Sequence, residues 1–201
     1  LVEDCLLRSW TTNLRGVVAG GAAAPWHVFM AGVVGATCPH LEAGALAEIV
    51  DWLWREQPQR NLWRRPVPGM IELARALRTA GVAVAIISNS EGRLAQLIAE
   101  VGWADVFDPI ADSGVLGIEK PTRGIFDWTF ARLGVAPDEV VHVGDSWAAD
   151  VVGARGVGAR AIWFGRVDDR ALPGGVAAAR DAAEVAAVLT AWGVLHRATA
   201  P

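Results

Sequence analysis

The chain has 201 residues, 53% of them hydrophobic, and a formal net charge of −4. This length and composition allow one substantial domain plus a small accessory one, and they exclude a disordered tail or a miniprotein. The acidic balance and the lack of a long Lys or Arg run argue against nucleic acid or an anionic membrane as a partner. Two cysteines, Cys5 and Cys38, could pair. We expect reduced thiols instead, because a core of this size needs no disulfide.

The uncharged stretch 16–38 is long enough to be considered as a membrane span. It consists mainly of Gly, Ala and Val and contains Pro25 and His27, so it lacks the Leu and Ile that drive insertion most strongly. It also lacks the basic start and cleavage site of a secretory signal. We therefore interpret this stretch as closely packed helices of a cytoplasmic protein with no membrane partner.

Residues 3 to about 62 show no alternating strand pattern and are typical of helices. Breaks are expected at Gly20–Gly21, Pro25 and Cys38–Pro39. One amphipathic face is formed by apolar residues at helical spacing, namely Leu46, Ile49, Val50, Leu53 and Trp54. The sequence thus predicts a small all-helical domain over residues 1–62.

From Pro66 onward, short apolar strands alternate with helices. Helices are predicted at about 69–79, 91–101, 123–133, 147–155 and 180–192, and strands at 82–87, 109–111, 140–143 and 159–164. Continuously apolar strands that alternate with helices indicate a parallel sheet covered on both faces. The predicted fold class is therefore α/β, with a Rossmann-like parallel sheet and helices on both of its faces over residues 63–201.

Polar residues follow these strands. The run His-Val-Gly-Asp-Ser-Trp-Ala-Ala-Asp at 142–150 ends a buried strand on two carboxylates, Asp145 and Asp150. Ser88 and Asn89 close the strand 82–87, and Lys120 precedes Pro121 in a loop. Right-handed crossovers bring the carboxyl ends of parallel strands to one edge, where open α/β sheets bind their ligands. An acid pair at such an edge is suited to Mg²⁺, with Asp145 as the ligand.

At these residues the chain resembles the haloacid dehalogenase-like hydrolase superfamily. The resemblance extends from about Pro66 to Arg166, and its second, third and fourth motifs match Ser88, Lys120 and Gly144-Asp145 with Asp150. It implies catalytic roles for Ser88, Lys120, Asp145 and Asp150, substrate binding by Ser88, Asn89 and Lys120, and Mg²⁺ as the cofactor. It also implies that residues 1–62 form a mobile cap over the strand ends, with a hinge near 61–68.

The first motif of that superfamily, D-x-D-G-T, supplies the nucleophilic Asp and does not occur in the 201 residues. Residues 1–4, Leu-Val-Glu-Asp, resemble the stretch that directly follows this motif, so we expect the natural protein to extend upstream by about one strand and a loop. In that fold the strand lies between those that end at Ser88 and Asp145. The 201-residue chain alone is therefore expected to be inactive.

Simpler explanations exist for each motif. Asp145 and Ser146 could cap the helix at 147–155. Ser88 or Ser90 could cap the helix at 91–101, whose free amides would also form a phosphate cradle. Lys120 taken alone resembles a surface lysine. The mid-strand His142 is expected to be a core residue without a chemical role.

Together these features predict a Mg²⁺-dependent phosphatase that acts on a small phosphorylated metabolite through an aspartyl-phosphate, with the Asp absent from this sequence. The pair Asp145 and Asp150 favours a phosphatase over the metal-free dehalogenases that the chain resembles at Ser88-Asn89. Two alternatives stay open: a non-catalytic binding or scaffold protein on the same fold, and a 2-haloacid dehalogenase-like enzyme. The sequence indicates no particular oligomeric state.

Overall fold

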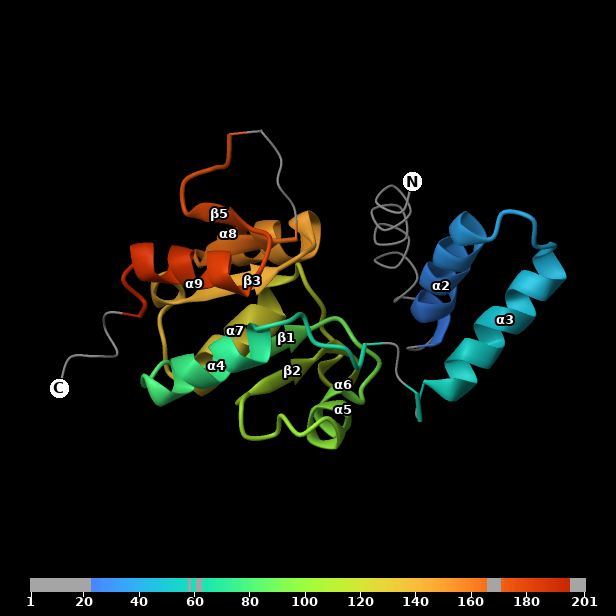
Figure 1. The fold of residues 1–201 in the computed structure, drawn as a ribbon, viewed down its shortest axis with the longest axis horizontal. Helices are drawn as coiled ribbons and strands as arrows, with labels where there is room; N and C mark the ends of the chain where they lie inside the picture. The colour runs from blue at the N-terminus through green and yellow to red at the C-terminus, as the bar shows by residue number, and fades with distance from the viewer. Residues whose placement is uncertain (1–22, 58, 61–62, 166–170, 196–201) are drawn as a thin grey trace. The chain divides into compact units, whose positions relative to one another are not determined.

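The computed structural model describes residues 23–57, 59–60, 63–165 and 171–195 (Figure 1). The chain divides into two compact units, Leu1–Arg64 and Arg65–Pro201. Within the described residues, no helix has the length and apolar character needed to cross a membrane. The cytoplasmic location expected from the sequence stays a prediction.

The described part of the first unit is a pair of helices, α2 (Ala23–Thr37) and α3 (Ala43–Glu56). The break predicted at Cys38–Pro39 is confirmed, because α2 ends at Thr37. The break predicted at Pro25 is wrong: this residue lies in the first turn of α2, where its missing N–H removes no intrahelical hydrogen bond. The break predicted at Gly20–Gly21 lies outside the described residues.

The second unit contains parallel strands, as the sequence predicts, but in two sheets. In the smaller sheet β1 (Ile86–Ser88) pairs with β2 (Ile110–Asp112). In the larger, β4 (Arg160–Phe164) lies between β3 (Val141–Gly144) and β5 (Val176–Ala179). The strands β1 and β3 are not hydrogen-bonded to each other, and a cavity of about 750 Å³ is lined by residues of both. The described residues thus contain no strand that joins the two sheets.

Helices alternate with these strands along the second unit (Figure 1). They are α4 (Met70–Thr79), α5 (Leu94–Glu100), α6 (Ser113–Leu116), α7 (Arg123–Leu133), α8 (Gly153–Val157) and α9 (Ala182–Ala191). The helix predicted at 147–155 is divided, because a π-helical segment at Trp147–Val152 precedes α8. A single 3-10 turn, Pro137–Glu139, leads into β3.

Apolar side chains form separate cores on the two faces of the strands. On one face, α7 and α8 pack with Trp163 of β4. On the other, α4 and α9 pack with Ile162 of the same strand. Successive side chains of a strand point to opposite faces, so the adjacent residues Ile162 and Trp163 belong to different cores. Helices therefore cover both faces of the strands, as predicted.

Candidate active site

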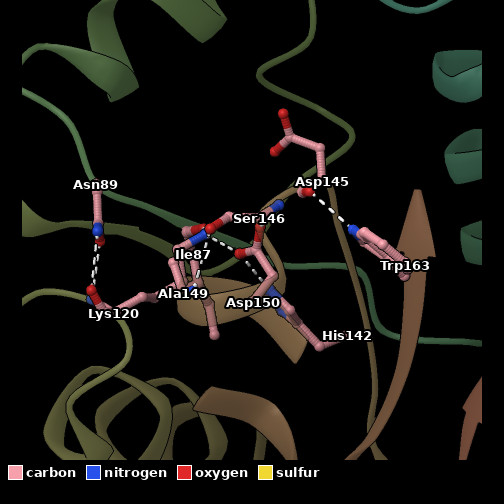
Figure 2. A network of polar contacts seen from close by, with 9 residues as sticks. All are labelled: Ile87, Asn89, Lys120, His142, Asp145, Ser146, Ala149, Asp150 and Trp163. Atoms are coloured by element: carbon pink, nitrogen blue, oxygen red, sulfur yellow. Dashed lines mark hydrogen bonds and ion pairs between the residues drawn. The ribbon is translucent and has the colours of Figure 1, made fainter. Parts of the chain in front are cut away.

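A buried polar cluster lies at the carboxyl ends of β1 and β3 (Figure 2). The Lys120 ammonium donates to Asp150 Oδ1 at 2.6 Å and to the Ile87 carbonyl oxygen at 2.8 Å. The ring Nε2 of His142 lies 3.0 Å from the same Asp150 oxygen. The side chains of Lys120 and Asp150 are only 12% and 5% exposed. The fold thus brings together Lys120 and Asp150, two of the residues that the sequence analysis singled out.

Asp150 reaches this position because residue 144 is glycine. A Cβ atom at Gly144 would lie 2.2 Å from the carboxyl carbon of Asp150, far inside van der Waals contact. The second carboxylate oxygen, Oδ2, accepts a hydrogen bond from the Ser146 amide at 2.9 Å. The Gly144-Asp145 motif therefore serves first to admit the Asp150 side chain to the end of β3.

Opposing effects set the charge state of the cluster. Burial raises the pKa of the Asp150 carboxyl, but the hydrogen bond from His142 and the positive charge of Lys120 outweigh burial and hold this pKa well below its ordinary value. Burial also lowers the pKa of His142, more than the Asp150 carboxylate raises it. Near neutral pH, Asp150 is thus ionised and His142 is neutral. Since a carboxylate only accepts, Nε2 of His142 carries the proton and donates it.

Asn89 holds the loop that carries Lys120. Its Oδ1 accepts from the Lys120 backbone amide at 2.8 Å, and its Nδ2 donates to the Lys120 carbonyl at 3.0 Å. This two-point contact fixes the backbone of Lys120 from the end of β1. Substrate binding by Asn89 stays a prediction, and the contacts make it a positioning residue for Lys120. Ser88 is the last residue of β1 and is half-buried.

Asp145 is the exposed carboxylate of the site. Its side chain points away from Asp150 (Figure 2), and in the part of the chain that the structure describes its carboxylate makes no hydrogen bond or ion pair. Its backbone oxygen accepts from the Trp163 indole at 3.0 Å, which fixes the start of the turn. The capping role suggested for Asp145 and Ser146 falls to Ser146 alone, which accepts from the Ala149 amide at 3.1 Å. Asp145 thus remains available to a ligand.

The caps predicted at Ser88 or Ser90 are wrong. The next helix, α5, begins only at Leu94, and Asp112 at the end of β2 accepts from the amides of Gly92 and Leu94 at 3.0 and 2.9 Å. These amides are therefore not free to form the phosphate cradle that we expected there. Sequence analysis missed Asp112, although a carboxylate directly after the strand predicted at 109–111 was a usable signal.

The role of His142 was also missed. It is buried, as expected for a core residue, but it contacts Asp150 and so belongs to the polar cluster. Residues two apart in a strand share a face, so His142 and Gly144 lie on the same side of β3. A side chain that packs on Gly144 therefore lies next to His142. This shared face was the signal in the sequence that could have predicted the contact between His142 and Asp150.

Asp145 is the group best suited to a metal ion. Mg²⁺ commonly takes only one or two protein carboxylates and completes its shell with water and phosphate oxygens. Among the described residues no three His, Cys, Asp or Glu side chains form a cluster that could hold a metal. Asp150 already accepts hydrogen bonds from Lys120, His142 and Ser146. Asp145 is thus the carboxylate of this site that could accept a metal ion, and its binding of Mg²⁺ stays a prediction.

Comparison with known proteins identifies the family. A model of the haloacid dehalogenase-like hydrolases matches residues 17–158, more than half of the chain. The chain belongs to this family. Among solved structures, a haloacid dehalogenase (HAD) phosphatase from Thermococcus onnurineus is 27% identical, with a TM-score of 0.59 over 73% of this chain and 70% of that one. The family and fold class predicted from the sequence are confirmed.

Two curated relatives show how much of a haloacid dehalogenase-like protein the chain represents. The "Haloacid dehalogenase-like hydrolase domain-containing protein 3" of Bos taurus is 32% identical over 117 residues, which cover 58% of this chain and 46% of that protein. A phosphoserine phosphatase of Thermus thermophilus is 32% identical over 120 residues, which cover 59% and 47%. The chain therefore spans about half the length of the curated relatives it matches.

Proposed function

We propose that this haloacid dehalogenase-like protein is a Mg²⁺-dependent phosphatase of a small phosphorylated metabolite. The observation that carries the proposal is the buried Lys120–Asp150 pair at the strand ends, together with the exposed Asp145 that directly follows β3. Relatives named as phosphatases support the reaction class. A scaffold would gain no chemical advantage from burying an ion pair next to an unpartnered acid.

Lys120 is proposed to bind the phosphoryl group. An ammonium has three donors, and in this structure Asp150 Oδ1 and the Ile87 carbonyl engage two of them. The third can donate to a phosphate oxygen. Asp150 and Asn89 would act as positioning residues, since Asp150 fixes the ammonium and Asn89 fixes the backbone of Lys120. The positive charge would offset the repulsion between a phosphate and Asp145.

Asp145 is proposed to hold Mg²⁺. The bound ion would neutralise charge on the phosphoryl oxygens and orient the group. The hydrogen bond from the Trp163 indole would hold the Asp145 backbone in place while the exposed carboxylate binds the ion. Ser88, at the end of β1, is proposed to donate its hydroxyl to the same phosphate.

We propose that the nucleophile is an Asp that is not among the 201 residues. In the proposed reaction a carboxylate attacks phosphorus, the ester oxygen leaves, and water then hydrolyses the resulting aspartyl-phosphate. Asp150 is unsuited to attack because it is buried and accepts three hydrogen bonds, and Asp145 would be occupied by the metal ion. The 201-residue chain would then bind phosphate without turning over a phosphate ester.

Residues 1–62 are proposed to be a mobile cap that closes over the strand ends. Closure would exclude water from the phosphoryl site and supply the contacts that select the substrate.

The alternative is a non-catalytic binding protein on the same fold, which the lack of a D-x-D-G-T sequence in the 201 residues favours. Calorimetric titration of the chain with inorganic phosphate, with and without Mg²⁺, distinguishes the two. The phosphatase proposal predicts that Mg²⁺ strengthens phosphate binding, that Asp145→Asn removes this coupling, and that Lys120→Met weakens phosphate binding with or without the ion. Phosphate binding that is absent, or indifferent to both substitutions, would contradict the proposal and favour a binding protein for another ligand.

A further inference from the structure

Asp112 is a buried carboxylate at the end of β2. It lies opposite Ser88 in the pairing of β1 with β2, and only 3% of it is exposed. Its Oδ1 accepts from the amides of Gly92 and Gly114 at 3.0 and 2.9 Å, and its Oδ2 accepts from the Leu94 amide at 2.9 Å. Burying a charge is costly, and hydrogen bonds to the charged group offset this cost. These bonds therefore join the end of β2 firmly to the backbone around it.

Capping of α6 explains only one of these bonds. Asp112 is the N-cap of α6 and accepts there from Gly114, which belongs to its own segment. The amides of Gly92 and Leu94 lie 20 and 18 residues earlier in the chain, where the loop after β1 leads into α5. Accepting from amides of two segments uses both oxygens of the carboxylate. Asp112 therefore joins two loops as well as capping a helix.

The two residues after Asp112 strengthen this connection. The Ser113 hydroxyl donates to the Ser90 carbonyl at 3.0 Å and accepts from the Ser90 amide at 2.9 Å. A Cβ atom at Gly114 would lie 2.4 Å from the Gly92 nitrogen, so the two backbones are in direct contact. Residues 112–114, which we call the loop clamp, thus fix the loop that follows β1.

The loop held by the clamp begins with Asn89. This residue is exposed, so packing does not hold its side chain in place. It lies between Ser88, the last residue of β1, and Ser90, the first residue that the clamp holds. The strand fixes the backbone on one side of Asn89, and the clamp fixes it on the other. The position of the Asn89 side chain therefore depends on the clamp.

Asn89 in turn holds Lys120, through the amide at 2.8 Å and the carbonyl at 3.0 Å. The Lys120 ammonium has a second set of contacts, to the Ile87 carbonyl and to Asp150. Loss of the clamp should therefore loosen the backbone of Lys120 first and its ammonium less. The expected result is a weaker phosphoryl site that still folds and still contains the Lys120–Asp150 pair.

We propose that Asp112 is a positioning residue of the phosphoryl site, which acts through Asn89 on the backbone of Lys120. Its effect on phosphate binding rests on the proposed function. The path from Asp112 to Lys120 is a property of the chain itself and can be measured without a ligand.

Amide hydrogen exchange of the 201-residue chain, followed by NMR, tests the path. Asp112→Asn keeps the size of the side chain, but its NH₂ group cannot accept from the Leu94 amide. We expect the Lys120 amide to exchange about tenfold or more faster, and the Arg160 amide, which is paired in the other sheet, to keep its rate. The matched control is Asp181→Asn at the N-cap of α9, which should leave both rates unchanged.

A second variant guards against misfolding. If Asp112→Asn does not fold, Ser113→Ala removes both hydrogen bonds to Ser90 and tests the same clamp. A purely structural role would lower global stability and accelerate the Lys120 and Arg160 amides alike. That result, or a Lys120 amide that exchanges at the wild-type rate, would overturn the proposal.

Calorimetric titration with inorganic phosphate tests the consequence for the site. Asp112→Asn should weaken phosphate binding about tenfold, the size of effect that loss of an outer partner has at metal ligands. In the background of Asn89→Ala the same substitution should weaken binding much less, because the path is already broken. An equal loss with and without Asn89 would overturn the proposal. If the wild-type chain binds no phosphate, the proposed function fails, and the exchange rates still decide whether Asp112 positions Lys120.

Discussion

Replacing Lys120 with Met tests the buried ion pair. Met keeps an unbranched apolar stem of similar length, so the substitution removes mainly the charge. At 2.6 Å and an effective dielectric constant of about 20, the attraction between Lys120 and Asp150 is about 6 kcal/mol before desolvation is counted. Because both side chains are nearly buried, solvent screens this pair little. The substitution also leaves the Ile87 carbonyl without its donor.

Removing one partner of a buried pair typically costs about 3–5 kcal/mol. We therefore expect Lys120→Met to lower the free energy of unfolding by about 3 kcal/mol or more in urea titrations at pH 7. Arg123→Met is the matched control: its pair with Asp127 at 2.8 Å is exposed at both ends and should contribute no more than about 1 kcal/mol.

The pH dependence provides a second check on Lys120→Met. A carboxyl whose folded pKa is lowered stabilises the protein above its unfolded pKa, and the stabilisation is lost as the pH falls through the folded value. The difference between wild type and Lys120→Met should therefore be largest near neutrality and shrink below about pH 4. Equal losses for the Lys120 and Arg123 variants, or a difference that does not change with pH, would refute the assignment of Lys120 as the charge partner of Asp150.

Four further predictions concern the same edge of the sheet. Gly144→Ala should lower the free energy of unfolding by about 1–3 kcal/mol or more, because the added Cβ would overlap Asp150. Gly156→Ala, whose added Cβ has open space, should leave the stability unchanged or raise it. Equal effects of the two substitutions in thermal unfolding would contradict this prediction. Burial lowers the pKa of His142, so below about pH 6.5 the unfolded state binds a proton that the folded state does not. As the pH falls further, the free energy of unfolding of the wild type should therefore decrease by up to about 1.4 kcal/mol per pH unit relative to that of His142→Gln. Parallel pH profiles of the two proteins would argue against a neutral His142. Asp145→Asn should change the free energy of unfolding by less than about 0.5 kcal/mol, since the carboxylate is exposed. In a form of the protein that contains the nucleophile, the same substitution should lower kcat by roughly two orders of magnitude. Phosphomonoester hydrolysis by the 201-residue chain should not exceed the blank, and steady Mg²⁺-dependent turnover would show that a residue of this chain attacks phosphorus.

Elements with clear terminal signals could be predicted from the sequence. α7 ends before Gly134, which adopts a left-handed conformation that few other residues tolerate, and the apolar run before Gly144 marked β3. β5 was not predicted because its residues, Val176–Ala179, are mostly alanine, which has little strand preference. It forms by pairing with β4, a long-range contact that no local pattern encodes.

Only part of the site could be predicted, because local sequence patterns do not encode its long-range contacts. Strand ends and crossovers are enough to bring Lys120 to Asp150, and the structure places them 2.6 Å apart. Asp150, which His142 contacts, lies in a π-helical segment after β3, and sequence periodicity does not predict such a segment. Asp112 was missed because its carboxylate binds amides of the loop at 92–94, which precedes it in the chain by about 20 residues.

We propose that the carboxyl edge of β1 and β3 is a metal-dependent phosphoryl site. NMR of the Trp163 indole tests it most directly, because this group donates to the backbone of Asp145. In the presence of inorganic phosphate, Mg²⁺ should shift the Trp163 indole and Ser146 amide signals of the wild-type chain to saturation and leave those of Asp145→Asn unchanged. Signals that do not respond to Mg²⁺, or that shift equally in the variant, would contradict the assignment of Asp145 as the metal ligand.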